Sequence, residues 1–220
     1  MQANPTVNNA TAVSIDDRAT ALTRARYQRI SPIYDLLELV TERRFRRWRK
    51  KLWQLVRGPE ILEVGVGTGK NIEYWPVHSE ITAIDLTPGM LDIARNRAMR
   101  LDWDVDLRLG DVQSLEFPSA SFDTVVATCV FCSVPDPVLG LREIGRVVRR
   151  GGQVVLLEHM RVNVPVIGAM MDALNPIIVQ LWGANINRRT LENIRAAGLH
   201  IEQVENLDPV GMFKLIVARS

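Results

Sequence analysis

Glu63-Val64-Gly65-Val66-Gly67-Thr68-Gly69 is the stretch that decides the fold, because three glycines stand at alternate positions directly after an apolar run. The run, residues 61–66, predicts a short strand, and the glycines predict a tight turn. Glycine permits a positive φ and carries no side chain, so a ligand can approach the backbone closely here. Open parallel sheets bind ligands at the carboxyl ends of their strands, which is where this turn lies.

Further apolar runs alternate with helical patterns along the chain. Strands are predicted over residues 61–66, 81–86, 105–109, 122–131, 154–158, 199–204 and 213–218. Helices are predicted over residues 88–100, 138–148 and 187–198, and after the turn that begins at Gly67. Strands that alternate with helices at this spacing indicate βαβ crossovers, and therefore an α/β fold with a doubly wound, parallel sheet.

The chain of 220 residues is long enough for one α/β domain with a modest elaboration. Residues 1–57 are predicted to form a flexible polar arm (1–17) followed by basic amphipathic helices, which end at Gly58-Pro59. Residues 58–220 are predicted to form the α/β domain. The first 57 residues hold twelve Lys and Arg against five Asp and Glu, so we expect a cationic front on a mildly acidic body.

The two cysteines, Cys129 and Cys132, lie in the apolar run Val-Val-Ala-Thr-Cys-Val-Phe-Cys-Ser-Val, and the three histidines are scattered. This context favours a buried thiol pair over a metal or redox motif, so no metal is expected. No secretory signal and no apolar stretch long enough to span a bilayer are visible. The expected location is the cytoplasm, or the inner face of a membrane as a peripheral protein.

Carboxylates stand at the ends of three predicted strands. Glu63 precedes the first glycine, Asp85 lies at the tip of the second strand, and Asp111 follows the third. Asp85 is placed to accept hydrogen bonds from both hydroxyls of a ribose, and Asp111 from the amino group of an adenine. Three acids suit a ligand with a ribose, an amine and a sulfonium charge, and they repel a pyrophosphate. The glycine spacing also differs from the dinucleotide pattern G-x-G-x-x-G, although a glycine loop alone would serve NAD equally well.

This arrangement resembles the class I S-adenosylmethionine-dependent methyltransferases from about residue 61 to residue 161. The resemblance implies a Rossmann-like, mostly parallel sheet of seven strands with the last strand antiparallel. It also implies S-adenosyl-L-methionine as cofactor and S-adenosyl-L-homocysteine as product. It assigns the methionine side of the cofactor to Glu63, Gly65, Gly67, Thr68 and Gly69. It assigns the ribose to Asp85, the adenine to Leu86, Met90, Gly110, Asp111 and Val112, and the floor of the site to Thr128 and Cys129.

Three residues are candidates for work near the acceptor. His159 follows the fifth predicted strand, where it would orient the nucleophile or take its proton; the alternative is a polar residue that merely ends a strand. Tyr27 and Tyr34 are expected to close over the cofactor, because Tyr34-Asp35 resembles a Tyr-Asp pair of quinone-biosynthesis methyltransferases; the alternative is packing between helices. Methyl transfer depends mainly on positioning, so a base is needed only if the nucleophile starts protonated.

Two segments favour a lipophilic acceptor. Residues 43–51 read Arg-Arg-Phe-Arg-Arg-Trp-Arg-Lys-Lys, and Phe45, Trp48 and Leu52 share one side. Such a basic amphipathic helix can lie in an anionic membrane interface; the alternative is that the aromatics pack on the domain and the cations are solvated. The second segment is an apolar insertion on the acceptor side, residues 161–186, broken by two prolines. It would line an apolar pocket or touch lipid.

Resemblance narrows the acceptor only partly. The N-terminal part and the glycine loop are similar to bacterial phosphatidylethanolamine N-methyltransferases and to ubiquinone and menaquinone methyltransferases. Residues 129–134, 157–159 and 183–188 are also similar to membrane-associated alkyl-thiol methyltransferases. A phospholipid amine is the first expected acceptor, with a small hydrophobic thiol or a quinol next. A cofactor-binding regulatory module and an RNA-binding module are the alternatives from other classes, although no nucleic acid is expected because no reading element accompanies the basic helix.

Overall fold

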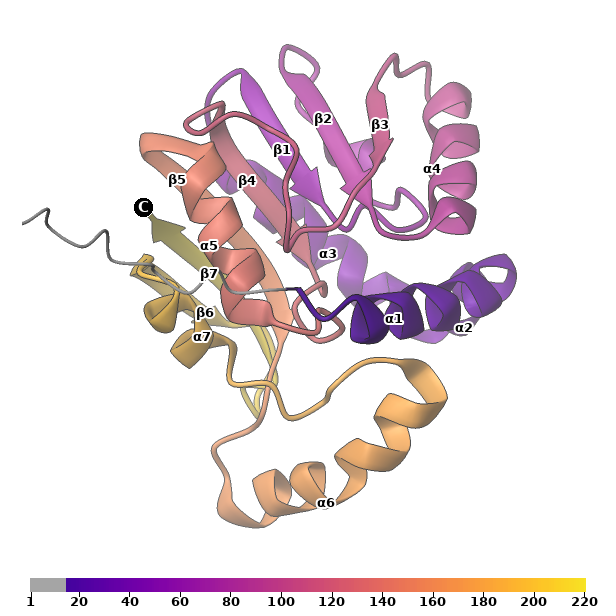
Figure 1. Ribbon diagram of the computed structural model, residues 1–220, viewed down its shortest axis with the longest axis vertical. Helices are drawn as coiled ribbons and strands as arrows, with labels where there is room; N and C mark the ends of the chain where they lie inside the picture. The colour runs from indigo at the N-terminus through magenta and orange to yellow at the C-terminus, as the bar shows by residue number, and fades with distance from the viewer. Residues whose placement is uncertain (1–14) are drawn as a thin grey trace, which may run out of the picture.

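The computed structural model describes residues 15–220, in which helices cover both faces of a seven-stranded sheet (Figure 1). Most of the predicted arm, residues 1–14, lies outside the described residues. Asp17 begins helix α1 (Asp17–Ile30), and the Asp16 carboxylate caps it by accepting a hydrogen bond from the Ala19 N–H at 2.9 Å.

The sheet has the strand order β3-β2-β1-β4-β5-β7-β6. The strands are β1 Glu60–Val64, β2 Glu80–Asp85, β3 Asp106–Leu109, β4 Phe122–Thr128, β5 Val148–His159, β6 His200–Asn206 and β7 Phe213–Arg219. Strands β1 to β5 pair in parallel, whereas β7 runs antiparallel to both β5 and β6. The predicted fold class is therefore confirmed. Because β1 has β2 on one side and β4 on the other, the strand order reverses there and a crevice opens at the carboxyl ends.

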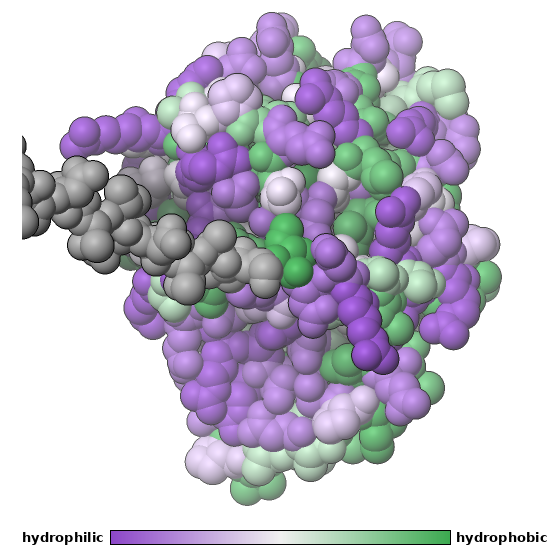
Figure 2. Space-filling model, viewed as in Figure 1, coloured by the Kyte–Doolittle hydropathy of each residue, from purple (hydrophilic) through white to green (hydrophobic). Residues whose placement is uncertain are grey.

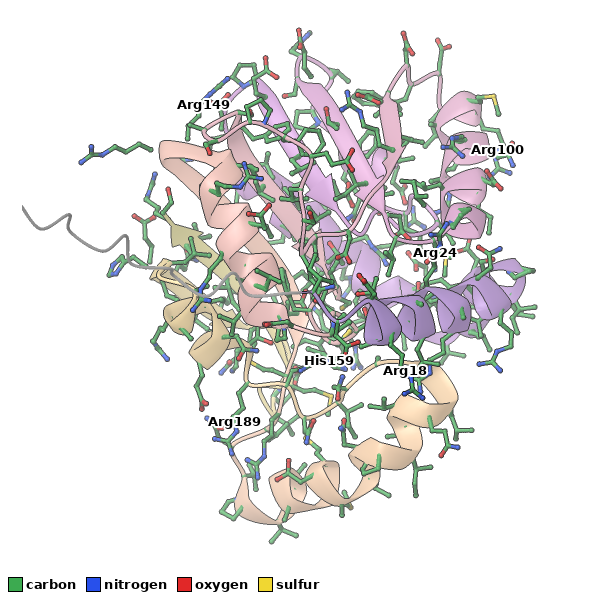
Figure 3. The ribbon with its side chains drawn as sticks, viewed as in Figure 1. Arg18, Arg24, Arg100, Arg149, His159 and Arg189 are labelled. Carbon is green, nitrogen blue, oxygen red and sulfur yellow. The ribbon has the colours of Figure 1, made fainter. Side chains whose placement is uncertain are left out.

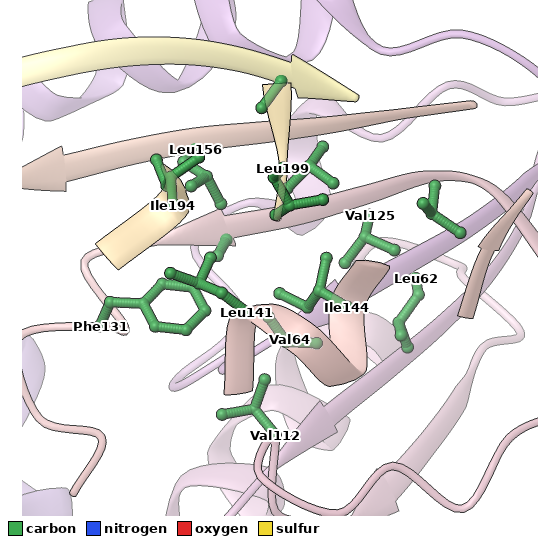
Figure 4. Close-up of a cluster of buried hydrophobic side chains, with 14 of the residues drawn as sticks. Leu62, Val64, Val112, Val125, Phe131, Leu141, Ile144, Leu156, Ile194 and Leu199 are labelled. Carbon is green, nitrogen blue, oxygen red and sulfur yellow. The ribbon is translucent and has the colours of Figure 1, made fainter. Parts of the chain in front are cut away.

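Helices enclose the sheet in two apolar layers. The larger helices after α1 are α3 Leu39–Leu55, α4 Pro88–Arg100, α5 Pro137–Val147, α6 Pro165–Trp182 and α7 Thr190–Ala196. Successive residues of a strand face opposite sides, so Leu62 packs with α5 and α7, and Ile61 with α3 and α4. Figure 4 shows the first of these clusters, in which Leu141 and Ile144 of α5 lie against the sheet.

Three element boundaries differ from the sequence-based prediction. Strand β4 ends at Thr128 instead of residue 131, because Cys129 takes a positive φ of 55° that turns the chain out of the sheet. Strand β5 begins at Val148 instead of residue 154, since the chain bends at Gly151 (φ 80°) without leaving the sheet. The helix predicted after the glycine turn is only the 3₁₀ turn η2 (Ile72–Tyr74).

The predicted N-terminal helices are α1, the 3₁₀ turn η1 (Ser31–Ile33), α2 (Tyr34–Leu37) and α3. The apolar side of α3 packs into the domain: the rings of Phe45 and Trp48 lie 5.4 and 5.0 Å from that of Phe213, and Leu52 is fully buried. This packing matches the alternative considered for residues 43–51, in which the aromatics pack on the domain, and contact of the outer cations with a membrane stays a prediction. The domain core occupies that side, and the cations on the outer side remain exposed, except for the buried Arg49.

The insertion contains one continuous helix, α6, instead of two broken pieces. Pro165 stands in the first turn, where a helix needs no N–H donor, and the helix continues through Pro176 to an end at Gly183, which has a φ of 84°. The Arg161 N–H donates to the Arg188 carbonyl at 2.9 Å, so the excursion leaves and rejoins the domain at one point. Within residues 15–220, none of the helices combines the length and the apolar character needed to cross a membrane.

Candidate active site

A cavity lies at the carboxyl ends of β1 to β4, with α1 along one side (Figure 3). Twelve of the predicted cofactor residues line it: Tyr27, Tyr34, Gly65, Gly67, Asp85, Leu86, Met90, Gly110, Asp111, Val112, Thr128 and Cys129. The sequence reasoning missed Thr23, Ile84, Thr87, Val130, Ser133, Val134 and Pro135, which also line it. Four of these missed residues lie in the loop after β4, of which Val130 was predicted to belong to the strand; Ser133, Val134 and Pro135 follow the predicted strand and carry no cofactor-binding motif.

The glycine turn shapes the floor of this cavity. Gly65 has a φ of 66°, and a Cβ there would overlap the Val130 side chain. Gly67 has a φ of 57°, and a Cβ there would meet nothing within 4 Å. Packing and backbone conformation both require a glycine at position 65, whereas only backbone conformation requires one at position 67. The space around Gly67 is open and can admit a ligand.

Asp85 lies at the tip of β2 with both carboxylate oxygens fixed by backbone donors. The Gly67 N–H donates to Oδ2 at 2.9 Å and the Thr87 N–H to Oδ1 at 2.8 Å. Burial raises the pKa of Asp85, and these two donors partly offset the rise. Each carboxylate oxygen can accept a second hydrogen bond, so this side chain can still bind two hydroxyls.

Asp111 marks the far end of the cavity, beyond β3. It accepts hydrogen bonds from the Gln113 N–H at 2.8 Å and from the Thr20 hydroxyl of α1 at 3.5 Å. The nearby side chains of Met90 and Val112 are 2% and 7% exposed and supply apolar surface. A flat, amine-bearing ring would fit between these apolar side chains and the carboxylate.

Three predicted cofactor residues lie outside this cavity. Glu63 is 1% exposed and accepts hydrogen bonds from Asn71 Nδ2 at 2.6 Å and Trp75 Nε1 at 2.7 Å. Burial raises its pKa to about 7, and these two donors oppose the rise. Gly69 allows close packing, because a Cβ there would lie 2.7 Å from Ile72 Cδ1. Thr68 lines a second, adjoining cavity.

The second cavity shares Tyr34, Gly65, Gly67, Thr128 and Cys129 with the first. It adds four charged or polar residues that the sequence reasoning did not select: Glu38, Arg49, Lys70 and Asn71. The Asn71 Oδ1 atom is buried without a hydrogen-bond partner among the described residues. Arg49 is 5% exposed and pairs with Glu42 at 2.8 Å. The sequence did not single out Arg49, because it is one of seven cations in residues 43–51 and the sequence does not show which of them points into the domain.

The N-terminal helices close over both cavities through polar contacts. No residue of α1 is fully buried, yet Gln28 accepts a hydrogen bond from the Gly89 N–H at 2.9 Å. Asp35 accepts from the Thr68 hydroxyl at 2.7 Å and pairs with Arg97. Burial opposes ionisation of Asp35, but Thr68, Arg97 and Lys70 outweigh it and lower its pKa. This cover is therefore held by hydrogen bonds and ion pairs more than by apolar packing.

Tyr27 of α1 and Tyr34 of α2 belong to this cover and face the cavities, with ring centroids 6.4 Å apart. Tyr27 lines the first cavity and Tyr34 lines both. Burial raises the pKa of both phenols, so they are neutral at physiological pH. The two cysteines are free thiols; Cys129 lines both cavities, and burial raises the pKa of each.

His159 ends β5 but lines neither cavity. Its Nδ1 atom is buried and has no partner among the described residues, and burial lowers its pKa, so the ring is neutral. Its neighbour Glu158 contacts the site instead: Oε1 accepts from the N–H groups of Val130 at 2.8 Å and Phe131 at 3.2 Å. Sequence reasoning placed no role on Glu158, because a fully buried carboxylate inside an apolar strand has no distinguishing pattern.

Comparisons with known proteins agree with this geometry. A model of the methyltransferase domain matches residues 62–156. The chain is 41% identical over 105 residues to the phosphatidylethanolamine N-methyltransferase of Cereibacter sphaeroides, covering 47% of this chain and 52% of that protein. It is 29% identical over 169 residues to a demethylmenaquinone methyltransferase of Staphylococcus aureus, covering 71% and 68%. The matched region thus spans about half the length of the first relative.

Solved structures share the fold. One is described as a possible histamine N-methyltransferase from Thermotoga maritima, with a TM-score of 0.69, 21% identity and coverage of 88% of this chain and 98% of that chain. Another is the geranyl diphosphate C-methyltransferase of Streptomyces coelicolor, with a TM-score of 0.66, 15% identity and coverage of 85% and 84%. That second structure holds S-adenosyl-L-homocysteine.

The sheet and the crevice have the fold of these solved methyltransferase structures, and residues 62–156 match the methyltransferase domain. This match implies S-adenosylmethionine as the cofactor. The residues present fit that cofactor. Asp85 and Asp111 stand at one end of the joined cavities. Arg49, Lys70, Glu38 and the partnerless Asn71 oxygen stand at the other end, where an amino acid with both charges would lie.

Proposed function

We propose that this protein methylates the amine of a phospholipid, with phosphatidylethanolamine as the first candidate. The observation that carries this proposal is the 41% identity to a phosphatidylethanolamine N-methyltransferase over 105 residues. An apolar helix beside the cavity mouth supports it, because a lipid acceptor needs an apolar approach to the site. A nucleic-acid or purely regulatory role has no comparable support.

We assign the nucleoside end of the cofactor to the first cavity. Asp85 accepts hydrogen bonds from the ribose hydroxyls, and Asp111 accepts one from the adenine amine. Leu86, Met90 and Val112 hold the ring by apolar contact, and Gly110 leaves room for it. These roles follow from the placement of the carboxylates at neighbouring strand ends and from the two oxygens that Asp85 presents.

We assign the methionine end to the second cavity. Asn71 Oδ1, buried without a partner, accepts from the ammonium group, and Arg49 binds the carboxylate. Glu63 holds Asn71 through its Nδ2 group and so fixes which amide atom points into the cavity. Thr68 and Gly69 support the turn, Gly65 and Gly67 admit the ligand, and Thr128 and Cys129 form the floor.

The chain's contribution to the reaction is mainly positioning. When bound, the cofactor supplies a methyl group that its sulfonium charge activates for in-line displacement. Tyr27 and Tyr34 are neutral phenols that face the cavities from the N-terminal cover, so each can accept a hydrogen bond from an amine and aim its lone pair. The same cover keeps bulk water away from the reacting atoms.

His159 stays a candidate for proton transfer. Burial lowers its pKa, so the ring remains a neutral base at mildly acidic pH. If it takes the acceptor's proton, His159→Gln should lower kcat and remove the acidic limb of the pH–rate profile, while cofactor affinity measured by calorimetry stays the same. An unchanged pH profile would assign His159 to the structure alone.

The test of the proposed function is transfer of a labelled methyl group to defined acceptors. Purified protein would be offered phosphatidylethanolamine in mixed micelles, an alkyl thiol and a demethylated quinol. Label in monomethyl-phosphatidylethanolamine is the expected result. Label only in the thiol or the quinol would reject the amine.

A quinol is the second candidate, because the demethylmenaquinone methyltransferase match extends over more of the chain, 169 residues against 105. Both acceptors start protonated at neutral pH, the quinol at its ring hydroxyl and the amine as an ammonium group, so each must lose a proton before methyl transfer. The labelled-methyl test decides between them, and label in the methylated quinol alone would favour this candidate.

A further inference from the structure

Helix α6 carries a stripe of exposed apolar side chains that the fold does not cover. The stripe consists of Val166, Met170, Leu174, Ile177 and Leu181, which are 79%, 55%, 43%, 57% and 71% exposed. Their spacing of three or four residues puts them on one side of the helix. Single exposed apolar residues are ordinary, but a row over four turns indicates a contact surface.

The rest of α6 explains why this stripe faces outward. Gly168 and Met171 are buried against the domain, and a Cβ at Gly168 would lie 2.6 Å from the Arg161 guanidinium. The single charged residue of the helix, Asp172, pairs with Arg161 at 2.9 Å. Both ion-pair partners are thus held within the insertion, and the stripe itself carries no charge.

The helix is attached firmly beside the active site. Asn185, just after α6, donates from its backbone N–H to the Cys132 carbonyl at 2.8 Å, and the Asn175 side chain accepts from the Ile186 N–H at 2.9 Å. The Arg188 guanidinium donates to the Val134 carbonyl at 2.7 Å. Because residues 132–134 border the first cavity, whatever binds the stripe is brought to its mouth.

Cations lie next to the stripe. Helix α1 carries Arg18, Arg26 and Arg29 on one side, and within residues 15–220 none of these three guanidinium groups lies within ion-pair distance of a carboxylate. A Cβ at Gly183, the end of α6, would lie 3.4 Å from the Arg26 side chain. Figure 3 shows Arg18 between α1 and α6, and Figure 2 shows apolar residues along the rim formed by α6.

We infer that the stripe on α6 and the arginines of α1 together form a docking surface for an anionic lipid bilayer. The apolar side chains enter the boundary between headgroups and acyl chains, and the arginines contact lipid phosphates. A second copy of the chain fits this surface less well, because a symmetric pairing would bring the same unpaired arginines together. The inference goes beyond the proposed function, since binding requires no acceptor chemistry.

The test is co-sedimentation of the full chain with vesicles of phosphatidylcholine, with and without phosphatidylglycerol. The wild type should bind the anionic vesicles, and Met170→Glu with Ile177→Glu should weaken binding about tenfold or more. The matched control is Val77→Glu with Met99→Glu, because these residues are 76% and 68% exposed and lie near the amino ends of β2 and β3, away from the cavity. The control should bind like the wild type.

A second pair of measurements separates docking from folding. Both double variants should keep the wild-type cofactor affinity in calorimetry and the wild-type melting temperature. Replacing Arg18, Arg26 and Arg29 by Gln should remove the preference for anionic vesicles and weaken the dependence on salt. The inference is overturned if the α6 variant binds vesicles like the wild type. It is also overturned if light scattering finds a wild-type dimer that the α6 variant dissociates and no vesicle binding. Loss of methyl transfer with intact vesicle binding would reject only the proposed acceptor.

Discussion

At the scale of single residues, Asp85 is the side chain on which cofactor affinity should depend most. Asp85→Ala removes two acceptors for the ribose and should weaken S-adenosylmethionine binding by about 1.5–3 kcal/mol, a factor of ten to a hundred or more. Isothermal calorimetry measures this directly. Asp106→Ala, on the exposed start of β3, is the matched control and should bind like the wild type. Equal affinities for the two variants would contradict the ribose assignment.

Arg49 should discriminate between cofactor fragments. Arg49→Met removes the proposed partner of the methionine carboxylate and keeps most of the side-chain volume, while Glu42 keeps its contact with Lys70 at 3.0 Å. We expect affinity for S-adenosylhomocysteine to fall about tenfold and affinity for methylthioadenosine, which lacks the amino-acid part, to stay the same. The exposed neighbour Arg47→Met should change neither value. A loss for both ligands would mean that Arg49 only supports the fold.

Glu158 should make stability depend on pH. Burial raises its folded-state pKa from 4.5 to about 7, and its Oε2 atom has no partner among the described residues. The folded protein therefore keeps a proton that the unfolded chain loses, so the free energy of unfolding should fall as pH rises from about 4.5 to 7, by up to about 3 kcal/mol. Below that window the full stability is present.

Glu158→Gln tests this pH dependence, because its amide oxygen can keep both backbone hydrogen bonds without a charge. Urea unfolding at pH 5 should give similar stabilities for the variant and the wild type, whereas at pH 8 the variant should be the more stable. Burial also raises the pKa of Glu63 to about 7, so Glu63 lowers the free energy of unfolding as pH rises. Because both proteins keep Glu63, its effect cancels in the comparison. Parallel stability curves across this range would disprove the assignment to Glu158.

At the scale of elements, the glycine turn should tolerate no side chain at its first position. Gly65→Ala meets both a positive φ and the Val130 side chain, and the combined cost is about 2–4 kcal/mol. Gly151 also has a positive φ, 80°, but a Cβ there would meet no atom within 4 Å, so Gly151→Ala measures the cost of the backbone conformation alone. Differential scanning calorimetry should find a clearly larger fall in melting temperature for Gly65→Ala.

Element boundaries also mark what the sequence could predict. Apolar runs predicted every strand, and the alternation of strands with helices predicted the parallel sheet. The central strands β1, β4 and β5 are the clearest case because they bury both faces, whereas β3 and β6 at the sheet edges are largely exposed. The end of β4 was missed because residues 129–131 are as apolar as the strand itself, and only the positive φ of Cys129 ends it. The continuity of α6 through Pro176 was missed because an interior proline usually ends or kinks a helix.

At the scale of the whole molecule, the sequence predicted the residues proposed to bind the nucleoside end of the cofactor. It did not predict those proposed to bind the methionine end. Asp85 and Asp111 stand directly after strands, so chain order alone brings them together. Arg49 comes from a helix that precedes the sheet and reaches the cavity only by tertiary packing, and its neighbours in sequence carry the same charge. A binding site whose residues come from elements far apart in the chain has no short sequence motif by which it could be predicted.

The backbone hydrogen bond between Arg161 and Arg188 holds the two ends of the intervening segment together, so this segment can be replaced as a unit. Met171 of α6 is buried and Asn185 bonds to the Cys132 carbonyl, but neither core cluster contains a residue of α6. A two-glycine link in place of residues 163–186 should therefore leave a less stable chain that still melts in one transition and binds cofactor. Circular dichroism and calorimetry check this, and an unfolded product would refute it. Replacement of this one segment during evolution would change the acceptor and leave the cofactor-binding sheet unaltered.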